Sequence, residues 1–253
     1  GVHPMREALK SSSRRCHQVV VEQKKQNAPI NSILEICREK QIKVKSLSRE
    51  VFRKKYGAYP TQGIIGHFFP IKMLETHELI RQAFEHSPTP TLVMLDGIQD
   101  PQNLGAIIRS AEVLGIQGII IPKRRAAPLN ETVAKCSAGA VERMPVAWSS
   151  NLSRTLEDLK KERFWVVGVD MAGDQPCYSF KFDTPVVLVI GGEEKGIRPL
   201  IKKSCDFLIS IPMEGELNSL NASAACAVIF YEILRQKKNL WGDQKKSDKK
   251  RPG

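Results

Sequence analysis

The most informative stretch of the sequence is IPMEGELNSLNASAACAVIFYEIL, residues 211–234. The apolar run 207–211 predicts a strand, a Glu-Gly-Glu loop follows Pro212, and a long apolar helix follows Asn221. Ser219 and Asn221 stand at the start of this helix, where capping and ligand binding use the same chemical groups. Capping accounts for one of these two residues, so we expect the segment to bind a ligand as well.

Two earlier segments also follow predicted strands. NLGAIIR, from Asn103 to Arg109, comes after TLVMLDG, and GGEEKG, from Gly191 to Gly196, comes after PVVLVI. Such short apolar runs separated by helical or loop segments predict an α/β domain with a mostly parallel sheet covered on both faces. Open α/β sheets bind ligands at the carboxyl ends of their strands. The runs that predict this sheet are 91–95, 117–121, 164–169, 186–190 and 207–211.

Common nucleotide-binding and hydrolytic sites do not fit these segments. GGEEKGIR lacks the four-residue gap before Gly-Lys and the following Ser or Thr of a phosphate-binding loop. No G-x-G-x-x-G follows an early strand, and neither Ser219 nor Ser223 stands in a nucleophile elbow. The six cysteines include no CxxC pair, so we expect no metal and no disulfide framework, but reduced thiols in a cytoplasmic protein.

The chain length of 253 residues predicts two domains. Alternating helical and strand patterns indicate a small α/β domain over residues 1–70, with helices in 3–15, 27–41 and 49–57 and strands in 17–23, 42–48 and 62–68. We expect a linker over 71–90, a catalytic α/β domain over 91–238 and a basic, disordered tail over 239–253. The longest apolar windows are too short to span a membrane.

The net charge of +12 is concentrated at the two ends of the chain. Residues 1–70 carry 14 Lys/Arg against 5 Asp/Glu, residues 71–234 carry 17 against 20, and residues 235–253 carry 8 against 2. A basic surface favours a polyanionic partner, and for the first domain we expect RNA; for the tail, mere solubility is an equal alternative. Candidate RNA contacts flank the predicted strand 19–21, namely Arg14, Arg15, Lys24 and Lys25.

LDGIQDPQNLGAIIRSAE, GGEEKG and IPMEGELNSLNAS together resemble, in order and spacing, the three motifs of the SPOUT superfamily of S-adenosylmethionine-dependent RNA methyltransferases. The match is to its SpoU/TrmH branch of ribose 2′-O-methyltransferases. GVHPMREAL and TQGIIG resemble the L30e-like substrate-binding domain of RlmB-like members, with Thr61 where a histidine is usual. The resemblance implies a deep trefoil knot, which is an exception to the rule that chains avoid threading, and a symmetric homodimer with the active site near the subunit boundary.

The resemblance also implies roles for individual residues. Asn103, Arg109, Glu193, Ser219 and Asn221 match catalytic positions, and S-adenosylmethionine would contact the positions that match Gly191, Gly192, Ile211, Met213 and Leu220. Each of these residues also has a purely structural alternative. Asn103, Ser219 and Asn221 could cap helices, and Glu193 could be an exposed charge of a loop. The two glycines could form turns, and the apolar residues could pack in the core.

Arg109 is the first candidate for catalysis. Its predicted helix turns Leu104, Ile107 and neighbouring apolar positions to a core, which leaves the guanidinium for a ligand. Arginine stays charged in proteins, so we expect it to orient the target phosphate and polarise the 2′-hydroxyl while a carboxylate, phosphate oxygen or water takes the proton. The alternative is a surface salt bridge to Glu112.

The RlmB-like match implies a guanosine of large-subunit (23S) ribosomal RNA, in free RNA or in a ribosome precursor, as the substrate. A transfer-RNA ribose methyltransferase of the same branch is one alternative. A non-catalytic RNA-binding or ribosome-assembly protein with the same fold is the other.

Overall fold

The computed structural model describes residues 2–11, 15–23, 25, 27–58, 61–193, 195–215 and 219–238. The chain forms two compact units. The first consists of the described residues in 1–72 and 128–143, and the second of those in 73–127 and 144–253. The predicted tail, 239–253, lies outside the described residues.

The first unit contains a three-stranded sheet in the order β2-β1-β3. β1 pairs with β2 in parallel and with β3 in antiparallel orientation. All six elements predicted in 1–70 are present, with ends that differ by a few residues. They are α1 (Val2–Lys10), β1 (Cys16–Glu22), α2 (Ala28–Glu39), β2 (Lys43–Leu47), α3 (Arg49–Tyr56) and β3 (Ile64–Phe68).

Alternation along β1 gives this sheet a core on each face, because successive side chains of a strand point to opposite sides. Val19 and Val21 pack with residues of α1 and α2, such as Leu9 and Ile33. Val20 packs on the other face against Phe52 and Tyr56 of α3. Asn27 and Ser48 cap the helices α2 and α3 by accepting hydrogen bonds from backbone N–H groups in their first turns.

The segment 128–143 belongs to the first unit, although it comes from the middle of the predicted catalytic domain. It contains α6 (Glu131–Cys136) and the short η1 (Ala140–Glu142). Arg143 forms an ion pair with Glu7 of α1, and the Ser11 hydroxyl donates to the Glu142 carbonyl at 2.9 Å. A Cβ on Gly139 would lie 2.5 Å from the Glu7 Cβ. These contacts join residues more than 130 positions apart, so no local pattern indicates them.

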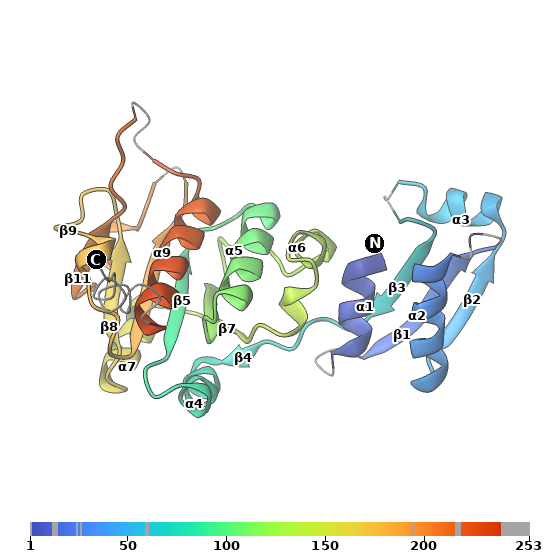
Figure 1. The fold of residues 1–253 in the computed structure, drawn as a ribbon, viewed down its shortest axis with the longest axis horizontal. Coiled ribbons are helices and arrows are strands. Elements are labelled where there is room, and N and C mark those ends of the chain that lie inside the picture. The colour runs from blue at the N-terminus through green and yellow to red at the C-terminus, as the bar shows by residue number, and fades with distance from the viewer. Residues whose placement is uncertain are drawn as a thin grey trace, which may run out of the picture. The chain divides into compact units, whose positions relative to one another are not determined.

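The second unit is built on an eight-stranded sheet in the order β4-β7-β6-β5-β10-β8-β11-β9, in which all pairs are parallel (Figure 1). The five predicted apolar runs form β5 (Thr91–Asp96), β6 (Gly118–Pro122), β8 (Trp165–Val169), β10 (Val186–Gly191) and β11 (Phe207–Ser210). The mostly parallel α/β domain is therefore confirmed. The remaining strands are β4 (Leu74–Glu75), β7 (Val146–Ser149) and β9 (Gln175–Pro176).

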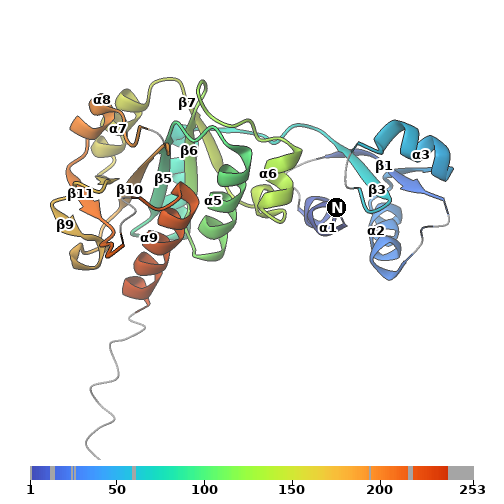
Figure 2. The same cartoon turned by 90° about the horizontal axis from the view of Figure 1, so that it is seen from above.

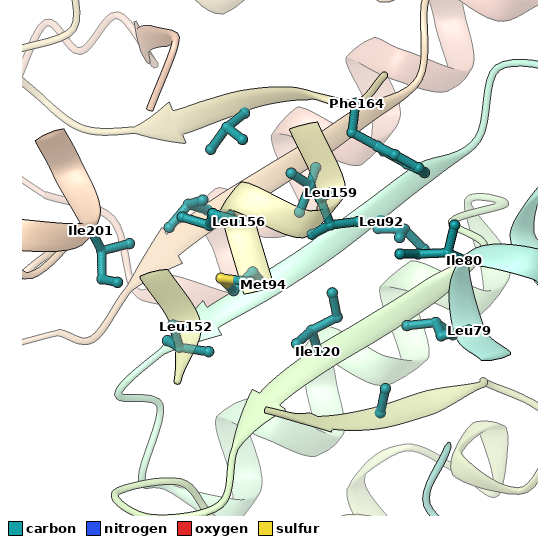
Figure 3. Packing of buried hydrophobic residues seen from close by; sticks show 14 of the residues in the cluster. Leu79, Ile80, Leu92, Met94, Ile120, Leu152, Leu156, Leu159, Phe164 and Ile201 are labelled. Atoms are coloured by element: carbon teal, nitrogen blue, oxygen red, sulfur yellow. The ribbon is translucent and has the colours of Figure 1, made fainter. Parts of the chain in front are cut away.

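Helices cover both faces of this sheet (Figure 2). α4 (Thr76–His86), α7 (Leu152–Lys161) and α8 (Pro199–Lys203) bury their apolar sides on one face against residues such as Leu92 and Met94 of β5 (Figure 3). α5 (Pro101–Val113) and α9 (Ala222–Lys237) lie side by side on the other face (Figures 1 and 2). The short η2 (Cys177–Ser179) precedes β10.

Part of the predicted linker 71–90 is integral to the second unit. β4 pairs with β7 at the edge of the sheet, and α4 buries Leu79, Ile80 and Ala83 in the main core. Leu79 packs so closely over β6 that a Cβ on Gly118 would lie 2.4 Å from its Cδ1. The segment therefore contributes packing rather than only connecting two domains.

None of the helices in the described ranges has the length and apolar character to cross a bilayer. The described residues also contain no group of three His, Cys, Asp or Glu side chains placed to hold a metal ion. Burial raises the pKa of the Cys37 and Cys205 thiols to about 11 and raises the pKa of the fully buried Cys226 further. These three thiols stay protonated at neutral pH. The trefoil knot stays a prediction.

Candidate functional site

The three sequence segments meet at the carboxyl ends of β5 and β10. Asn103 comes from the first turn of α5, Glu193 from the loop after β10, and Asn221 from the residue before α9. The Asn221 amide Nδ2 donates to Glu193 Oε1 at 2.9 Å and to Asn103 Oδ1 at 3.1 Å. The Asn103 amide also donates to Glu193 Oε1. Three predicted catalytic residues, up to 118 positions apart, thus form one hydrogen-bonded cluster.

Asn221 caps α9 with its side-chain oxygen and contacts the cluster with its side-chain nitrogen. Its Oδ1 caps α9 by accepting from the Ser223 backbone N–H at 2.9 Å and from the Ser223 hydroxyl at 2.6 Å. Its Nδ2 donates the two hydrogen bonds to Glu193 and Asn103. Asn103, in contrast, does not cap α5, because Asp100 is the cap and accepts from the Gln102 N–H at 2.9 Å. The capping alternative holds for Asn221 and is wrong for Asn103.

A pocket of about 390 Å³ opens beside this cluster. It lies between the end of β10, the end of β8 and the segment that leads into α9. All five predicted cofactor-binding residues line the pocket, namely Gly191, Gly192, Ile211, Met213 and Leu220. Two of the predicted catalytic residues, Glu193 and Ser219, line it as well. Ser219 lines the pocket and does not cap α9, since Asn221 is the cap. Sequence reasoning missed Asp170, Met171 and Lys195, which also line the pocket.

The two glycines of the pocket are required by the packing of the chain on itself. A Cβ on Gly191 would lie 2.0 Å from the Gly196 carbonyl carbon and 2.2 Å from the Ile197 nitrogen. A Cβ on Gly192 would lie 2.7 Å from the Gly97 carbonyl oxygen. From the sequence, these glycines are expected either to contact the cofactor or to form turns. The structure adds a different reason, because these glycines let the loop 191–197 fold back on itself and on the β5–α5 loop.

Asp96 and Arg198 anchor this loop, and sequence reasoning missed both. The Asp96 side chain is fully buried at the end of β5 and accepts from the Arg198 Nε at 2.7 Å and the Arg198 backbone N–H at 2.9 Å. The Gly192 N–H also donates to the Asp96 carbonyl at 3.0 Å. The available signal was a single carboxylate at the end of an otherwise apolar strand, since a buried charge needs partners.

We expect Asp96→Ala to lower the free energy of unfolding by about 2–3 kcal/mol, because it leaves the partly buried Arg198 N–H without its acceptor and removes an ion pair whose carboxylate is fully buried. Asp96→Asn keeps an acceptor of the same shape and should cost about 1 kcal/mol. Urea denaturation followed by circular dichroism measures both. A loss below about 0.5 kcal/mol for Asp96→Ala, the range of neutral surface changes, would show that the loop does not depend on this carboxylate.

Arg109 is not brought to the pocket within one chain. The apolar residues of its helix are buried as predicted, among them Leu104, Ile107, Ile108 and Ala111. Its side chain is exposed and does not line the pocket. Within the described residues its guanidinium has no hydrogen-bond or ion-pair partner, so the alternative of a surface salt bridge is not supported. Arg109 follows Asn103 by six residues, and six residues of an α-helix rotate the side-chain direction by about 240°. The two side chains therefore point to different sides of α5.

Two of the four predicted RNA contacts, Arg15 and Lys25, are among the described residues of the first unit. Arg15 lines a cavity of about 640 Å³ together with Lys40, Lys43 and Phe69, whose ring is 53% exposed. An exposed aromatic ring beside cations is the arrangement that binds single-stranded nucleic acid. Lys25 lies 3.9 Å from Glu22 and is half exposed. Arg14 and Lys24 are outside the described residues.

Comparison with known proteins agrees with this geometry. The profile of the SpoU rRNA Methylase family matches residues 90–231, which carry the cluster and the pocket. The chain belongs to the SpoU methylase family. A second profile, RNA 2′-O ribose methyltransferase substrate binding, matches residues 1–74. This protein is therefore a SpoU-family RNA 2′-O-ribose methyltransferase with a substrate-binding domain, as its motifs predicted.

Relatives of this SpoU methylase match along nearly their full length. It is 38% identical to YacO of Bacillus subtilis, which is named for the TrmH family of tRNA/rRNA methyltransferases, over 94% of each chain. A Staphylococcus saprophyticus protein named for the same family is 35% identical over 96% of this chain and 97% of its own.

Solved structures share the fold of this SpoU methylase. The SpoU methyltransferase AviRb from Streptomyces viridochromogenes has a TM-score of 0.80 at 23% identity, over 94% of this chain and 88% of its own. AviRb in complex with AdoMet has a TM-score of 0.76 at the same identity, over 94% and 89%.

Proposed function

We propose that this SpoU methylase transfers a methyl group from S-adenosylmethionine to the ribose 2′-hydroxyl of a guanosine in large-subunit ribosomal RNA. The observation that carries the proposal is the hydrogen-bonded cluster of Asn103, Glu193 and Asn221, of which Glu193 lines the pocket. The family of the chain and its substrate-binding domain support RNA as the substrate. The choice of ribosomal RNA and guanosine extends the RlmB-like sequence resemblance.

The residues of the pocket fit S-adenosylmethionine. Three large apolar side chains are exposed in the chain and line this one pocket: Met171 is 57% exposed, Leu220 42% and Met213 39%. Exposed apolar groups that converge on a concave site gain free energy by covering the faces of an aromatic base. Ser219 adds a hydroxyl to the lining, whereas the Asp170 carboxylate is already paired with Lys202 at 2.9 Å and accepts from the Ala172 N–H at 2.9 Å.

The bound donor would supply an activated methyl group on a sulfonium, so the work of the chain is to position the acceptor. Glu193 is held by two amide donors, which fix the direction of its carboxylate at the mouth of the pocket. Arg109 would orient the phosphate beside the target and polarise the 2′-hydroxyl, because a guanidinium stays charged and donates in a planar fork. The departing proton would pass to a carboxylate, a phosphate oxygen or water.

A second copy of the chain would bring Arg109 to the pocket. On α9 the exposed residues Ala224, Val228 and Tyr231 form a stripe at helical spacing, and on the adjacent α5 Arg109 is followed one turn later by Val113, which is 68% exposed. An exposed apolar stripe on α9 beside one exposed valine on α5 favours a helix-packed interface. We infer a homodimer that packs through α5 and α9, in which Arg109 acts at the pocket of the partner subunit.

Incubation of the protein with labelled S-adenosylmethionine and separate ribosomal and transfer RNA pools tests the function. We expect label in large-subunit ribosomal RNA, at a 2′-O-methylguanosine on nuclease mapping. Label in transfer RNA alone would support the transfer-RNA alternative and overturn the ribosomal assignment. Label in neither pool, from protein that binds S-adenosylmethionine and RNA, would favour a non-catalytic assembly protein.

A further inference from the structure

A second cleft, of about 670 Å³, lies on the other side of the loop that borders the cofactor pocket. Three loops form it, namely 96–103 after β5, 122–125 after β6 and 192–198 after β10. Gly192, Glu193, Lys195 and Gly196 line both the pocket and the cleft. A ligand in the cleft would therefore lie directly beside the catalytic cluster.

The carboxylates that line the cleft have hydrogen-bond or ion-pair partners in the portion of the chain that the structure describes, whereas most of its cations do not. Among the described residues, the three carboxylates that line the cleft are engaged within the chain: Asp96 with Arg198, Asp100 with the first turn of α5, and Glu193 with the two asparagines. The three remaining cations of the cleft form no hydrogen bond or ion pair within the described part of the chain. They are Arg124, Arg125 and Lys195, and all are exposed.

The loop that carries the two arginines is fixed at both ends. The Lys123 N–H donates to the Ser149 carbonyl at 2.9 Å, and the Ala127 N–H donates to the Ile98 carbonyl at 2.9 Å. Between these anchors Arg125 has a left-handed backbone with φ of +60°. A residue other than glycine keeps this conformation only when its surroundings impose it, and such positions gather at ligand-binding sites. The loop therefore holds the two guanidinium groups at the cleft.

We propose that this cleft binds the RNA backbone next to the target nucleotide, with Arg124 and Arg125 on phosphate oxygens and Lys195 between the cleft and the pocket. The inference rests on the proposed function and adds a phosphate-binding subsite to it. Guanidinium groups bind phosphate in a two-bond geometry, and the engaged carboxylates leave the cations free to do so. The subsite would fix the ribose at the mouth of the cofactor pocket.

The double variant Arg124→Gln/Arg125→Gln tests this inference, with Lys123→Gln as the matched control. Lys123 carries the same charge on the same loop and is exposed but does not line the cleft. The probe is an unmodified transcript of the RNA that the wild type labels. For the double variant we expect a Kd for RNA at least about tenfold higher and a shallower salt dependence, with a slope reduced by about 1.4 because each phosphate contact contributes about 0.7.

Affinity for S-adenosylmethionine, measured by titration calorimetry, should stay within about twofold of wild type in all variants. Lys123→Gln should change the RNA Kd by less than about twofold, and Arg124→Lys/Arg125→Lys should fall between wild type and the glutamine variant. The inference is overturned if the double variant binds RNA like Lys123→Gln or keeps the wild-type salt slope. A wild type that labels no RNA overturns the proposed function instead, so the two failures are distinct.

Discussion

Arg109→Ala should lower the single-turnover methylation rate by a factor of about 10² to 10³, the usual cost of removing one hydrogen-bond donor that stabilises the transition state. Affinity for S-adenosylmethionine should stay within about twofold, because Arg109 does not line the pocket of its own chain. Labelled S-adenosylmethionine and quenched time points measure the rate. Arg154→Ala is the control, since Arg154 is an exposed arginine on α7, which covers the other face of the sheet. Near-wild-type turnover of Arg109→Ala would exclude its catalytic role.

Mixed dimers test whether Arg109 acts on the partner subunit. Leu220→Arg places a charged side chain in the cofactor pocket at a residue that is 42% exposed, so it should block the pocket without unfolding the chain. A heterodimer of Arg109→Ala and Leu220→Arg, isolated with two affinity tags, keeps one complete site if Arg109 acts across the interface. We expect about half of the wild-type rate from this heterodimer. If Arg109 acts within its own chain, the heterodimer stays inactive.

The sequence predicts the parallel sheet and the cluster for the same physical reason. Buried strands such as β5 and β10 appear as short apolar runs, and the polar residues that interrupt the pattern after them mark the carboxyl edge. Asn103, Glu193 and Asn221 all follow such runs. The two-residue strands β4 and β9 are too short to show a period, so they were not predicted.

Long-range contacts explain the other differences. The segment 128–143 packs against α1 through contacts such as Arg143 with Glu7, and no neighbouring residue reveals that pairing. Arg124 and Arg125 belong to a run of three basic residues, which resembles a solvated loop until the cleft and the engaged carboxylates are known. The partner subunit that Arg109 would need is not encoded in any local pattern, although the exposed Val113, Val228 and Tyr231 indicate where it would bind.

Gly191→Ala should reduce the affinity for S-adenosylmethionine by at least about 30-fold. The added methyl group would lie 2.0 Å from the Gly196 carbonyl carbon and 2.2 Å from the Ile197 nitrogen, and both are backbone atoms. The loop 191–197 must therefore move, and it carries Gly192, Glu193 and Lys195 of the pocket wall. Overpacking of this kind also costs about 1–3 kcal/mol of unfolding free energy. Titration calorimetry and urea denaturation measure the two effects separately.

Gly215→Ala is the matched control for this change. Gly215 lies in the segment between β11 and α9, and a Cβ there would meet no atom within 4 Å. Its affinity for S-adenosylmethionine should match wild type, and its stability should change by less than about 0.5 kcal/mol. If both variants bind S-adenosylmethionine like the wild type, the donor does not need the folded-back loop, and the pocket beside the asparagine–glutamate cluster is not its binding site. If both variants lose affinity alike, glycine flexibility rather than the backbone clash controls binding.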